Sequence, residues 1–187
     1  VCGISNGAIF SNHLALKLSD RIGAIASIAG AISDTDRALK PSSPVSALII
    51  HGTDDRFVPF EGGEIKGALT IGGKVCSHAE TYKRWQDNNG GAAGTANSLT
   101  IAGNGIAMKG RCPVKLATPV EVTTTKTKSG ATCTSMIVEN GGHTWPGHIE
   151  QKLFGLDGVT AINIDATEAI GKFFYKAALD LKSGQIK

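Results

Sequence analysis

The chain of 187 residues has the length of one globular domain with a sizeable hydrophobic core. With 41% hydrophobic and 19% charged residues, its composition excludes an intrinsically disordered protein. The 19 basic and 16 acidic residues are interspersed, which is unlike the basic patch of a nucleic-acid-binding protein. The longest apolar stretch, residues 22–32, is shorter than the roughly 20 residues that a membrane span needs. We therefore expect neither nucleic acid nor a membrane as a partner.

The first part of the chain predicts three short buried strands and one helix. Residues 1–2 end a strand at a glycine, and residues 6–19 carry leucine and isoleucine at mixed helical spacing. The apolar runs 22–29 and 45–50 are bounded by turn-forming residues, which is typical of fully buried parallel strands. Strand, sharp turn and helix therefore follow one another at the start of the chain.

The second part predicts a helix, a hairpin and a further helix. Residues 75–88 place these side chains on one helical face: Val75, Ala79, Tyr82 and Trp85. The asparagines and glycines of 88–91 end that helix, and β-branched residues predict adjacent strands over 120–126 and 132–138. Asp165, with Glu168 three residues later, predicts a capping box that opens the last helix. Short strands that alternate with helices predict an α/β layered sheet.

Residues Gly3-Ile4-Ser5-Asn6-Gly7 form a G-x-S-x-G motif between a predicted strand and a predicted helix. This context is the one that a nucleophile elbow requires, because the sharp turn exposes the serine hydroxyl at the sheet edge. We expect strained backbone at Ser5, and collisions if Gly3 or Gly7 carried a side chain. The N–H of Asn6, at the helix start, would face a developing oxyanion. The alternative is an ordinary Gly-Ser turn.

A serine nucleophile needs a base and an acid that orients the base, and both have candidates. Asp54 and Asp55 directly follow the buried run 45–50, and His143 follows the run 132–138 on a loop with two glycines. Carboxyl ends of parallel strands share one sheet edge, so these groups would lie on the same side as Ser5. The order serine, aspartate, histidine is that of α/β-hydrolases. Both aspartates could instead be turn residues.

Other residues compete for these roles. Four further carboxylates are candidates for the acid, although Asp165 is better placed as a helix cap and no buried strand precedes the others: Glu61, Glu139, Asp157 and Asp165. We expect the remaining histidines to be structural or exposed: His13, His51, His78 and His148. Trp145, next but one to His143, is either a wall of the substrate cleft or part of the loop packing.

The four cysteines do not form a dense disulfide framework, and no C-x-x-C spacing indicates zinc. They are Cys2, Cys76, Cys112 and Cys133. One interpretation is a bridge between Cys112 and Cys133, and the other is that all four are small buried hydrophobic residues.

Three segments together resemble one enzyme family. They are GISNG at 3–7, HGTDDRFVPFEGG at 51–63 and NGGHTWPG at 140–147, and TYKRWQDNNG and DATEAIGKFF extend the likeness. The chain resembles the polyhydroxybutyrate depolymerase and feruloyl-esterase-like family of α/β-hydrolases over nearly its whole length. This resemblance implies that Ser5 is the nucleophile, Asp55 rather than Asp54 the acid, and His143 the base.

The resemblance also implies a fold and its boundaries. We expect residues 1–187 to be the C-terminal portion of one α/β-hydrolase catalytic domain, with a mostly parallel sheet flanked by helices. Family members carry several strands and an oxyanion-hole loop before the elbow, whereas this chain starts at the elbow strand. We therefore expect it to lack the N-terminal strands, so that a missing N-terminal segment, another chain or a second copy covers the exposed sheet.

The implied activity is that of a serine ester hydrolase that needs no cofactor and no metal. The implied substrates are short hydroxyalkanoate esters, or feruloyl and acetyl esters of plant cell walls, bound by the loops 57–65 and 145–156. Location outside the cell or in the periplasm is implied by the family alone, since no signal peptide is visible. The alternative function is a catalytically incomplete hydrolase-like module used for binding or structure.

Overall fold

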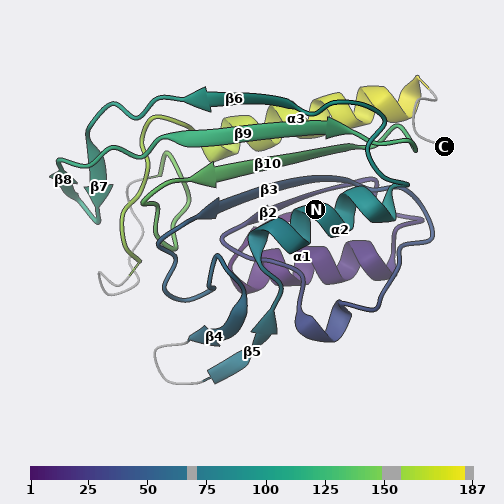
Figure 1. Ribbon diagram of the computed structural model, residues 1–187, viewed down its shortest axis with the longest axis horizontal. Coiled ribbons are helices and arrows are strands. Elements are labelled where there is room, and N and C mark those ends of the chain that lie inside the picture. Colours follow the sequence, from purple (N-terminus) through teal and green to yellow (C-terminus); the bar gives the residue numbers. More distant parts are fainter. Residues whose placement is uncertain (67–70, 149–156, 184–187) are drawn as a thin grey trace.

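The computed structural model describes residues 1–66, 71–148 and 157–183, which form a mixed α/β fold (Figure 1). Its centre is a six-stranded sheet with the order β1-β2-β3-β10-β9-β6. The strands in that order are β1 (Cys2–Ile4), β2 (Ala24–Ile28), β3 (Ser46–Gly52), β10 (Thr132–Val138), β9 (Val120–Lys126) and β6 (Asn97–Ile101). The expectation of an α/β layered sheet is confirmed.

The sheet is parallel on one side and antiparallel on the other. Strands β1, β2, β3 and β10 pair in parallel, whereas β9 pairs antiparallel with both β10 and β6. The turn after β9 closes the hairpin that the sequence predicts, with the N–H of Thr127 donating to Ala131 O at 2.9 Å. Because the four parallel strands run the same way, their carboxyl ends meet at one sheet edge.

Helices cover both faces of the sheet, with α3 (Ala166–Lys182) on one face and α1 (Asn6–Lys17) and α2 (His78–Asn88) on the other (Figure 1). Successive strand residues point to opposite faces, so Leu48 and Ile50 pack in the core with α3 while Ala47 and Ile49 pack with α1 and α2. This double burial explains why the central strands are continuous apolar runs in the sequence.

Helix α1 packs mainly through small and polar side chains, and of the leucines on which its prediction depends Leu16 is buried. Its buried residues are Ala8, Ser11, Asn12, Ala15 and Leu16, whereas Leu18 is exposed and lies beyond the helix. Asn12 accepts a hydrogen bond from Trp85 Nε1 at 2.8 Å and donates to Ser27 Oγ at 2.9 Å. One buried amide thus links α1 to α2 and β2.

Helix α2 begins later than predicted, and its buried face agrees with the predicted one in part. Ser77 caps it by accepting from Glu80 N at 3.0 Å, and Val75 belongs to the preceding strand. Trp85 is buried as predicted, but Ala79 is exposed and its predicted place is taken by His78. The predicted end is confirmed, since Gly90 and Gly91 follow with φ of 84° and 82°.

The predicted start of α3 is confirmed in part. Asp165 accepts from Glu168 N at 3.1 Å, so it caps the helix. The prediction that the Glu168 side chain completes a capping box is wrong, because its carboxylate pairs with Lys172 Nζ at 2.6 Å instead. Both of those charged side chains are exposed, so the pair adds little stability.

Two small hairpins and one short helix lie outside the main sheet. The hairpins pair β4 (Gly63–Lys66) with β5 (Ile71–Val75) and β7 (Ala107–Lys109) with β8 (Cys112–Val114). The short 3-10 helix covers Asp34–Asp36. The sequence prediction has none of these elements, nor strand β6.

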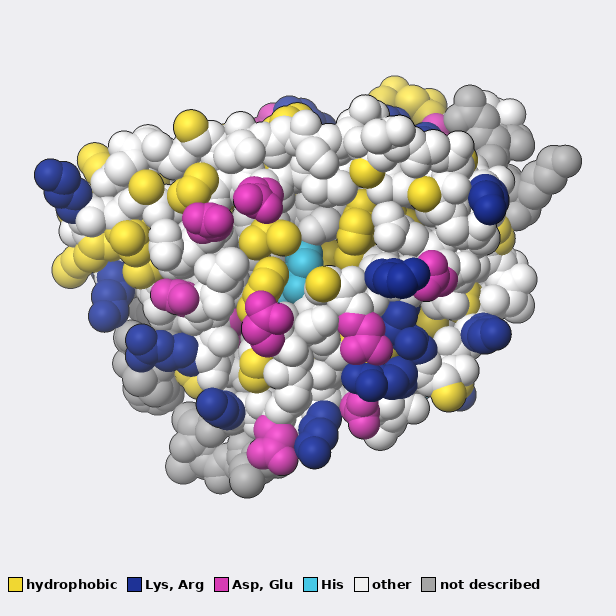
Figure 2. Space-filling view, in the orientation of Figure 1, with side chains coloured by type: hydrophobic (Ala, Val, Ile, Leu, Met, Phe, Trp, Pro, Cys, Tyr) yellow, Lys and Arg dark blue, Asp and Glu magenta, His cyan; other side chains and the backbone are white. Residues whose placement is uncertain are grey.

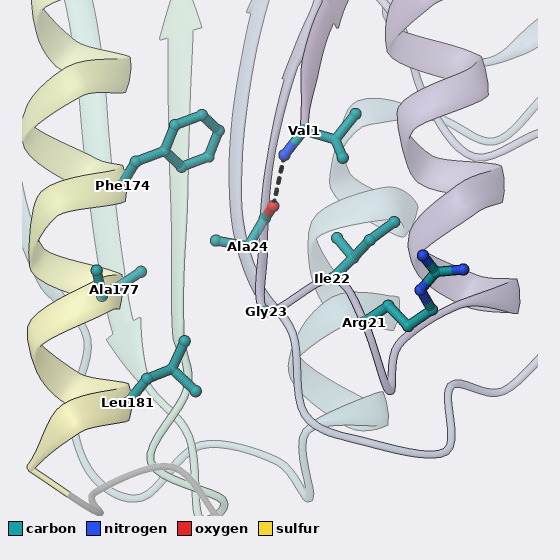
Figure 3. A pocket seen from close by; sticks show the side chains of 9 residues that line it. Val1, Arg21, Ile22, Gly23, Ala24, Phe174, Ala177 and Leu181 are labelled. Atoms are coloured by element: carbon teal, nitrogen blue, oxygen red, sulfur yellow. Dashed lines mark hydrogen bonds between the residues drawn. The ribbon is translucent and has the colours of Figure 1, made fainter.

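The surface agrees with the charge pattern of the sequence. Figure 2 shows basic and acidic side chains interspersed on the face that it presents, with hydrophobic side chains scattered among them. A pocket of about 270 Å³ lies between the start of β2 and the second half of α3, with Val1, Ala24, Phe174 and Leu181 in its wall (Figure 3). No helix in the described part of the chain is both long and apolar enough to cross a membrane.

Candidate active site

Ser5 lies at the turn between β1 and α1 in a conformation that is rare for a residue with a side chain. Its φ of 57° and ψ of −123° fall where glycine is favoured. The Ser5 N–H donates to Ile28 O at 3.0 Å, and the Ser5 carbonyl accepts from the N–H groups of Ala8 and Ile9 at 3.0 Å. Such strain costs about 1–3 kcal/mol and persists where the surrounding structure fixes the backbone, most often at functional sites.

Close packing of the backbone holds this turn. A Cβ atom on Gly3 would lie 2.5 Å from the carbonyl carbon of Gly7, so the expected collision at Gly3 is confirmed. The same expectation for Gly7 is wrong, because nothing lies within 4 Å of a Cβ atom there. Gly30 plays that part instead, since its Cβ would lie 2.5 Å from Ala8 Cβ and 3.0 Å from Ser5 O. The motif alone does not reveal Gly30, because it follows a different strand.

The two adjacent aspartates after β3 have different surroundings. Asp54 is exposed on the turn, and its N–H donates to Gly141 O at 2.9 Å. Asp55 is buried, and its Oδ2 accepts from His143 Nδ1 at 2.8 Å. The structure therefore brings His143 together with Asp55 rather than with Asp54.

The Asp55 carboxylate is surrounded by donors. Oδ1 accepts the backbone N–H groups of Phe57 and Val58, each at 2.9 Å. Oδ2 accepts His143 Nδ1 and also His51 Nε2, the latter at 3.2 Å. Four donors satisfy both oxygens of an ionised carboxylate that has no contact with bulk water.

These donors shift the acidity of Asp55. Burial raises the pKa of the carboxyl, but the hydrogen bonds and the proximity of His143 and His51 outweigh burial and lower the pKa from 3.8 to about 2. The ionised form is thus favoured in the folded chain. An ionised acceptor fixes the proton of His143 on Nδ1 and leaves Nε2 as the proton acceptor of that ring.

This shift predicts a loss of stability in acid. Because the folded pKa lies below the unfolded one, the contribution is present above pH 3.8 and is lost as the pH falls through about 2. We expect the free energy of unfolding of the wild type, relative to Asp55→Asn, to fall by about 2 kcal/mol between about pH 5 and pH 2. Urea unfolding of both proteins at each pH measures it. An unchanged difference would show that folding does not lower the pKa of Asp55.

The loop after β10 carries His143, which is buried with 5% of its surface exposed. Asn140 of this loop is left-handed, with a φ of 58°, whereas neither glycine of the predicted Gly pair is. Gly141 and Gly142 are needed for room, because a Cβ on Gly142 would overlap the carbonyl of Asp157. The Phe57 ring lies 5.2 Å from the His143 ring, so the loop 57–65 borders the site.

One sheet edge carries all three segments. Ser5 follows β1, Asp55 follows β3, and His143 follows β10, and these strands are parallel and belong to one sheet. Hydrogen bonds cross this edge from strand to strand, from Ser5 N to Ile28 O and from Thr53 N to Val138 O at 3.0 Å. The serine, the aspartate and the histidine therefore lie at the carboxyl ends of parallel strands of one sheet, with β2 between the strands that precede Ser5 and Asp55.

Asn6 is the first residue of α1, where the first backbone N–H groups of a helix have no acceptor within the helix.

The Trp145 ring packs against the core on the α3 side, and its Nε1 donates to Thr167 Oγ1 at 3.0 Å. These contacts favour the loop-packing interpretation of Trp145, and a role in substrate binding stays a prediction. Residues 149–156 of the second predicted substrate loop lie outside the described residues.

The predicted bridge between Cys112 and Cys133 is wrong, because both are free thiols. Cys133 lies in the core on a central strand, where burial raises its thiol pKa to about 12, whereas Cys112 is exposed on the outlying hairpin β7–β8. The alternative, that all four cysteines are small buried residues, is right for Cys76 and Cys133 and wrong for Cys2 and Cys112. The described residues contain no cluster of His, Cys, Asp or Glu side chains that could hold a metal ion.

The other histidines are only partly as expected. His148 is exposed, and His13 Nδ1 pairs with Asp36 at 2.9 Å away from this edge. His51 and His78 are buried, each 1% exposed, and His51 contacts the Asp55 carboxylate. Sequence reasoning missed this contact, although His51 ends a buried strand four residues before Asp55. Of the competing acids, Glu61 and Glu139 are exposed and Asp165 caps α3.

The chain is similar to a curated protein of the esterase class. That protein is "Putative esterase NocK" from Nocardia uniformis subsp. tsuyamanensis, which is 29% identical over 151 residues. The match covers 78% of this chain but only 41% of NocK. No protein-family model and no solved structure matches the chain. The narrower resemblance to polyhydroxybutyrate depolymerases and feruloyl esterases stays a prediction.

Proposed function

We propose that this chain carries the catalytic residues of a serine ester hydrolase with an α/β-hydrolase-type sheet. The observation that carries the proposal is a strained serine turn at the same sheet edge as a buried aspartate–histidine hydrogen bond. The similarity to NocK, which is named as an esterase, supports the same general class. The carboxylate of Asp55 contacts His143 Nδ1 at 2.8 Å, so Asp55 is its partner in the proposal.

The mechanism follows from the hydrogen-bond directions. His143 donates from Nδ1 to Asp55, so its Nε2 takes the proton of the Ser5 hydroxyl as the oxygen attacks the ester carbonyl. The tetrahedral intermediate expels the alcohol, which receives that proton from His143. Water, deprotonated by the same nitrogen, then attacks the acyl-serine. The Ser5 oxygen leaves with that proton from His143, and the acid is released. Asp55 stays ionised throughout and stabilises the imidazolium.

The N–H of Asn6 supplies one donor to the oxyanion. It follows the nucleophile directly and lies at the positive end of the α1 dipole. Preorganised donors of this kind lower the barrier because they meet the charge only as it develops. The chemistry as proposed needs no cofactor and no metal.

The proposed substrates are short hydroxyalkanoate esters, or feruloyl and acetyl esters of plant cell walls. The His143 side of the site is bordered by the Phe57 ring, and Trp145 follows on the same loop. Aromatic walls suit an acyl or aryl group, and the polar edge suits the ester itself. An extracellular or periplasmic location belongs to this proposal.

The test is acylation by a chromogenic ester. We expect p-nitrophenyl butyrate to give a burst of one nitrophenol per chain and a fluorophosphonate probe to label the protein stoichiometrically. Methyl ferulate and hydroxybutyrate oligomers, assayed in parallel, then distinguish the two substrate classes. A folded chain that shows neither burst nor labelling would favour the alternative, a non-catalytic hydrolase-like module. Equal rates on both esters would contradict the substrate proposal alone.

A further inference from the structure

Two imidazoles, and not one, contact the same oxygen of Asp55. His51 Nε2 lies 3.2 Å from Asp55 Oδ2 and 3.0 Å from the carbonyl oxygen of Val58. A carboxylate and a carbonyl are both acceptors, so His51 Nε2 must carry a hydrogen. His51 therefore donates to the oxygen that also receives the His143 hydrogen bond.

The His51 ring is buried and contacts two other aromatic rings. The side chain has no exposed surface, and Nδ1 has no hydrogen-bond partner in the part of the chain that the structure describes. A second proton on Nδ1 would be a buried donor without an acceptor, which is unfavourable. The Phe60 ring lies 5.7 Å from the His51 ring and the His78 ring lies 6.0 Å from it, both edge to face. Burial, and to a smaller extent the proximity of His51, lowers the pKa of His78 to about 3.

The Asp55 carboxylate can rotate about its Cβ–Cγ bond unless both oxygens are held. Oδ1 is held by the backbone of its own turn, at Phe57 and Val58. Oδ2 is held from inside the core by His51 and from the loop after β10 by His143. Of these two donors to Oδ2, His143 takes part in the proposed proton transfer and His51 does not.

We infer that His51 is a positioning residue, whose Nε2–H fixes Asp55 Oδ2 toward His143 Nδ1 and so sets the orientation of the His143 ring. Its catalytic consequence rests on the proposed ester hydrolase function. Misplacement of a reacting group by about 1 Å can lower a rate by about 100-fold. The loss of His51 should therefore lower kcat while leaving KM nearly unchanged, since His51 does not reach the substrate.

Three variants test this role. His51→Met fills the space without a donor, and His51→Gln places an amide N–H near the position of Nε2. His78→Met is the matched control, because His78 is equally buried and lies beside His51, but it bonds to Ser135 Oγ at 2.6 Å rather than to Asp55. We expect His51→Met to lower kcat about 10- to 100-fold and His51→Gln to restore most of it. His78→Met should change thermal stability only.

Proton NMR gives a readout that does not depend on activity. The hydrogen between His143 Nδ1 and Asp55 should give a far-downfield resonance in the wild type, in His51→Gln and in His78→Met. We expect His51→Met to shift or broaden it. An unchanged resonance and unchanged kcat in His51→Met would overturn the inference, as would equal losses in His78→Met.

A further test uses the wild-type protein and therefore does not depend on whether a variant folds. Nitrogen-15 NMR of the histidine rings should show a hydrogen on Nε2 of His51. A proton on Nδ1 instead would overturn the inference whether or not any ester is cleaved. If the wild type shows the hydrogen on Nε2 but no acylation, the proposed function fails while the positioning of Asp55 stands.

Discussion

Replacement of Ser5 by alanine is expected to lower ester turnover by about 10⁶-fold, as loss of the nucleophile does in another serine hydrolase. Ser5→Ala removes the attacking oxygen and keeps the backbone at a φ of 57°. Fluorophosphonate labelling should disappear with turnover. Steady-state hydrolysis of p-nitrophenyl butyrate and mass spectrometry of the labelled protein measure the two effects.

Ser5→Gly is the matched control for the strained backbone. It removes the same hydroxyl, but glycine adopts the left-handed conformation without the penalty that a Cβ atom brings. We expect both variants to be equally inactive and Ser5→Gly to be more stable than Ser5→Ala by about 1 kcal/mol. Labelling that persists in either variant would place the nucleophile elsewhere.

Asparagine at position 55 is expected to lower turnover by about 10⁴-fold, the effect of the corresponding change in another serine hydrolase. The amide cannot accept from His143 Nδ1 through its nitrogen, and it no longer stabilises the imidazolium. The favoured tautomer of His143 then changes, and Nε2 ceases to be a ready base. The measurement is kcat on p-nitrophenyl butyrate.

Asp54→Asn is the control one residue away. Asp54 is exposed on the turn, so its loss should leave turnover nearly unchanged and cost at most about 1 kcal/mol of stability. Thermal unfolding of both variants separates catalytic from structural loss. If Asp54→Asn, rather than Asp55→Asn, abolished turnover in a folded protein, the assignment of the acid would be wrong.

The sequence predicts the central strands well because burial on both faces leaves a continuous apolar run. The bounds of strands β2 and β3 agree with the predicted runs 22–29 and 45–50 to within two residues. Strand β6 was missed because most of its residues are exposed and carry no such pattern. The predicted face of helix α2 is right at Tyr82 and Trp85 but incomplete, because its buried positions also include His78 and Thr81, which look polar in the sequence.

The candidate site, like the fold, can be predicted from the sequence only in part. Ser5, Asp55 and His143 could be chosen because each follows a recognisable strand and belongs to a local motif. The role of Gly30 depends on a close contact with residues that are distant in the sequence. The role of His51 depends on a turn that folds the chain back on itself. The free thiols of Cys112 and Cys133 could not be foreseen, because spacing along the chain does not give the distance between an outlying hairpin and a central strand.

The loop that carries His143 is attached to the first turn of α3, and this attachment ties the base to a helix on the far face of the sheet. Ala166 N donates to Pro146 O at 3.0 Å, and Trp145 Nε1 bonds to Thr167. Ser5 and Asp55, by contrast, belong to the strand ends themselves. Opening of that helical turn would carry the base away while the sheet stayed intact, so partial unfolding would abolish the proposed activity reversibly before the global transition. In such a molecule, heat inactivation would report on the start of one helix rather than on the strength of the core.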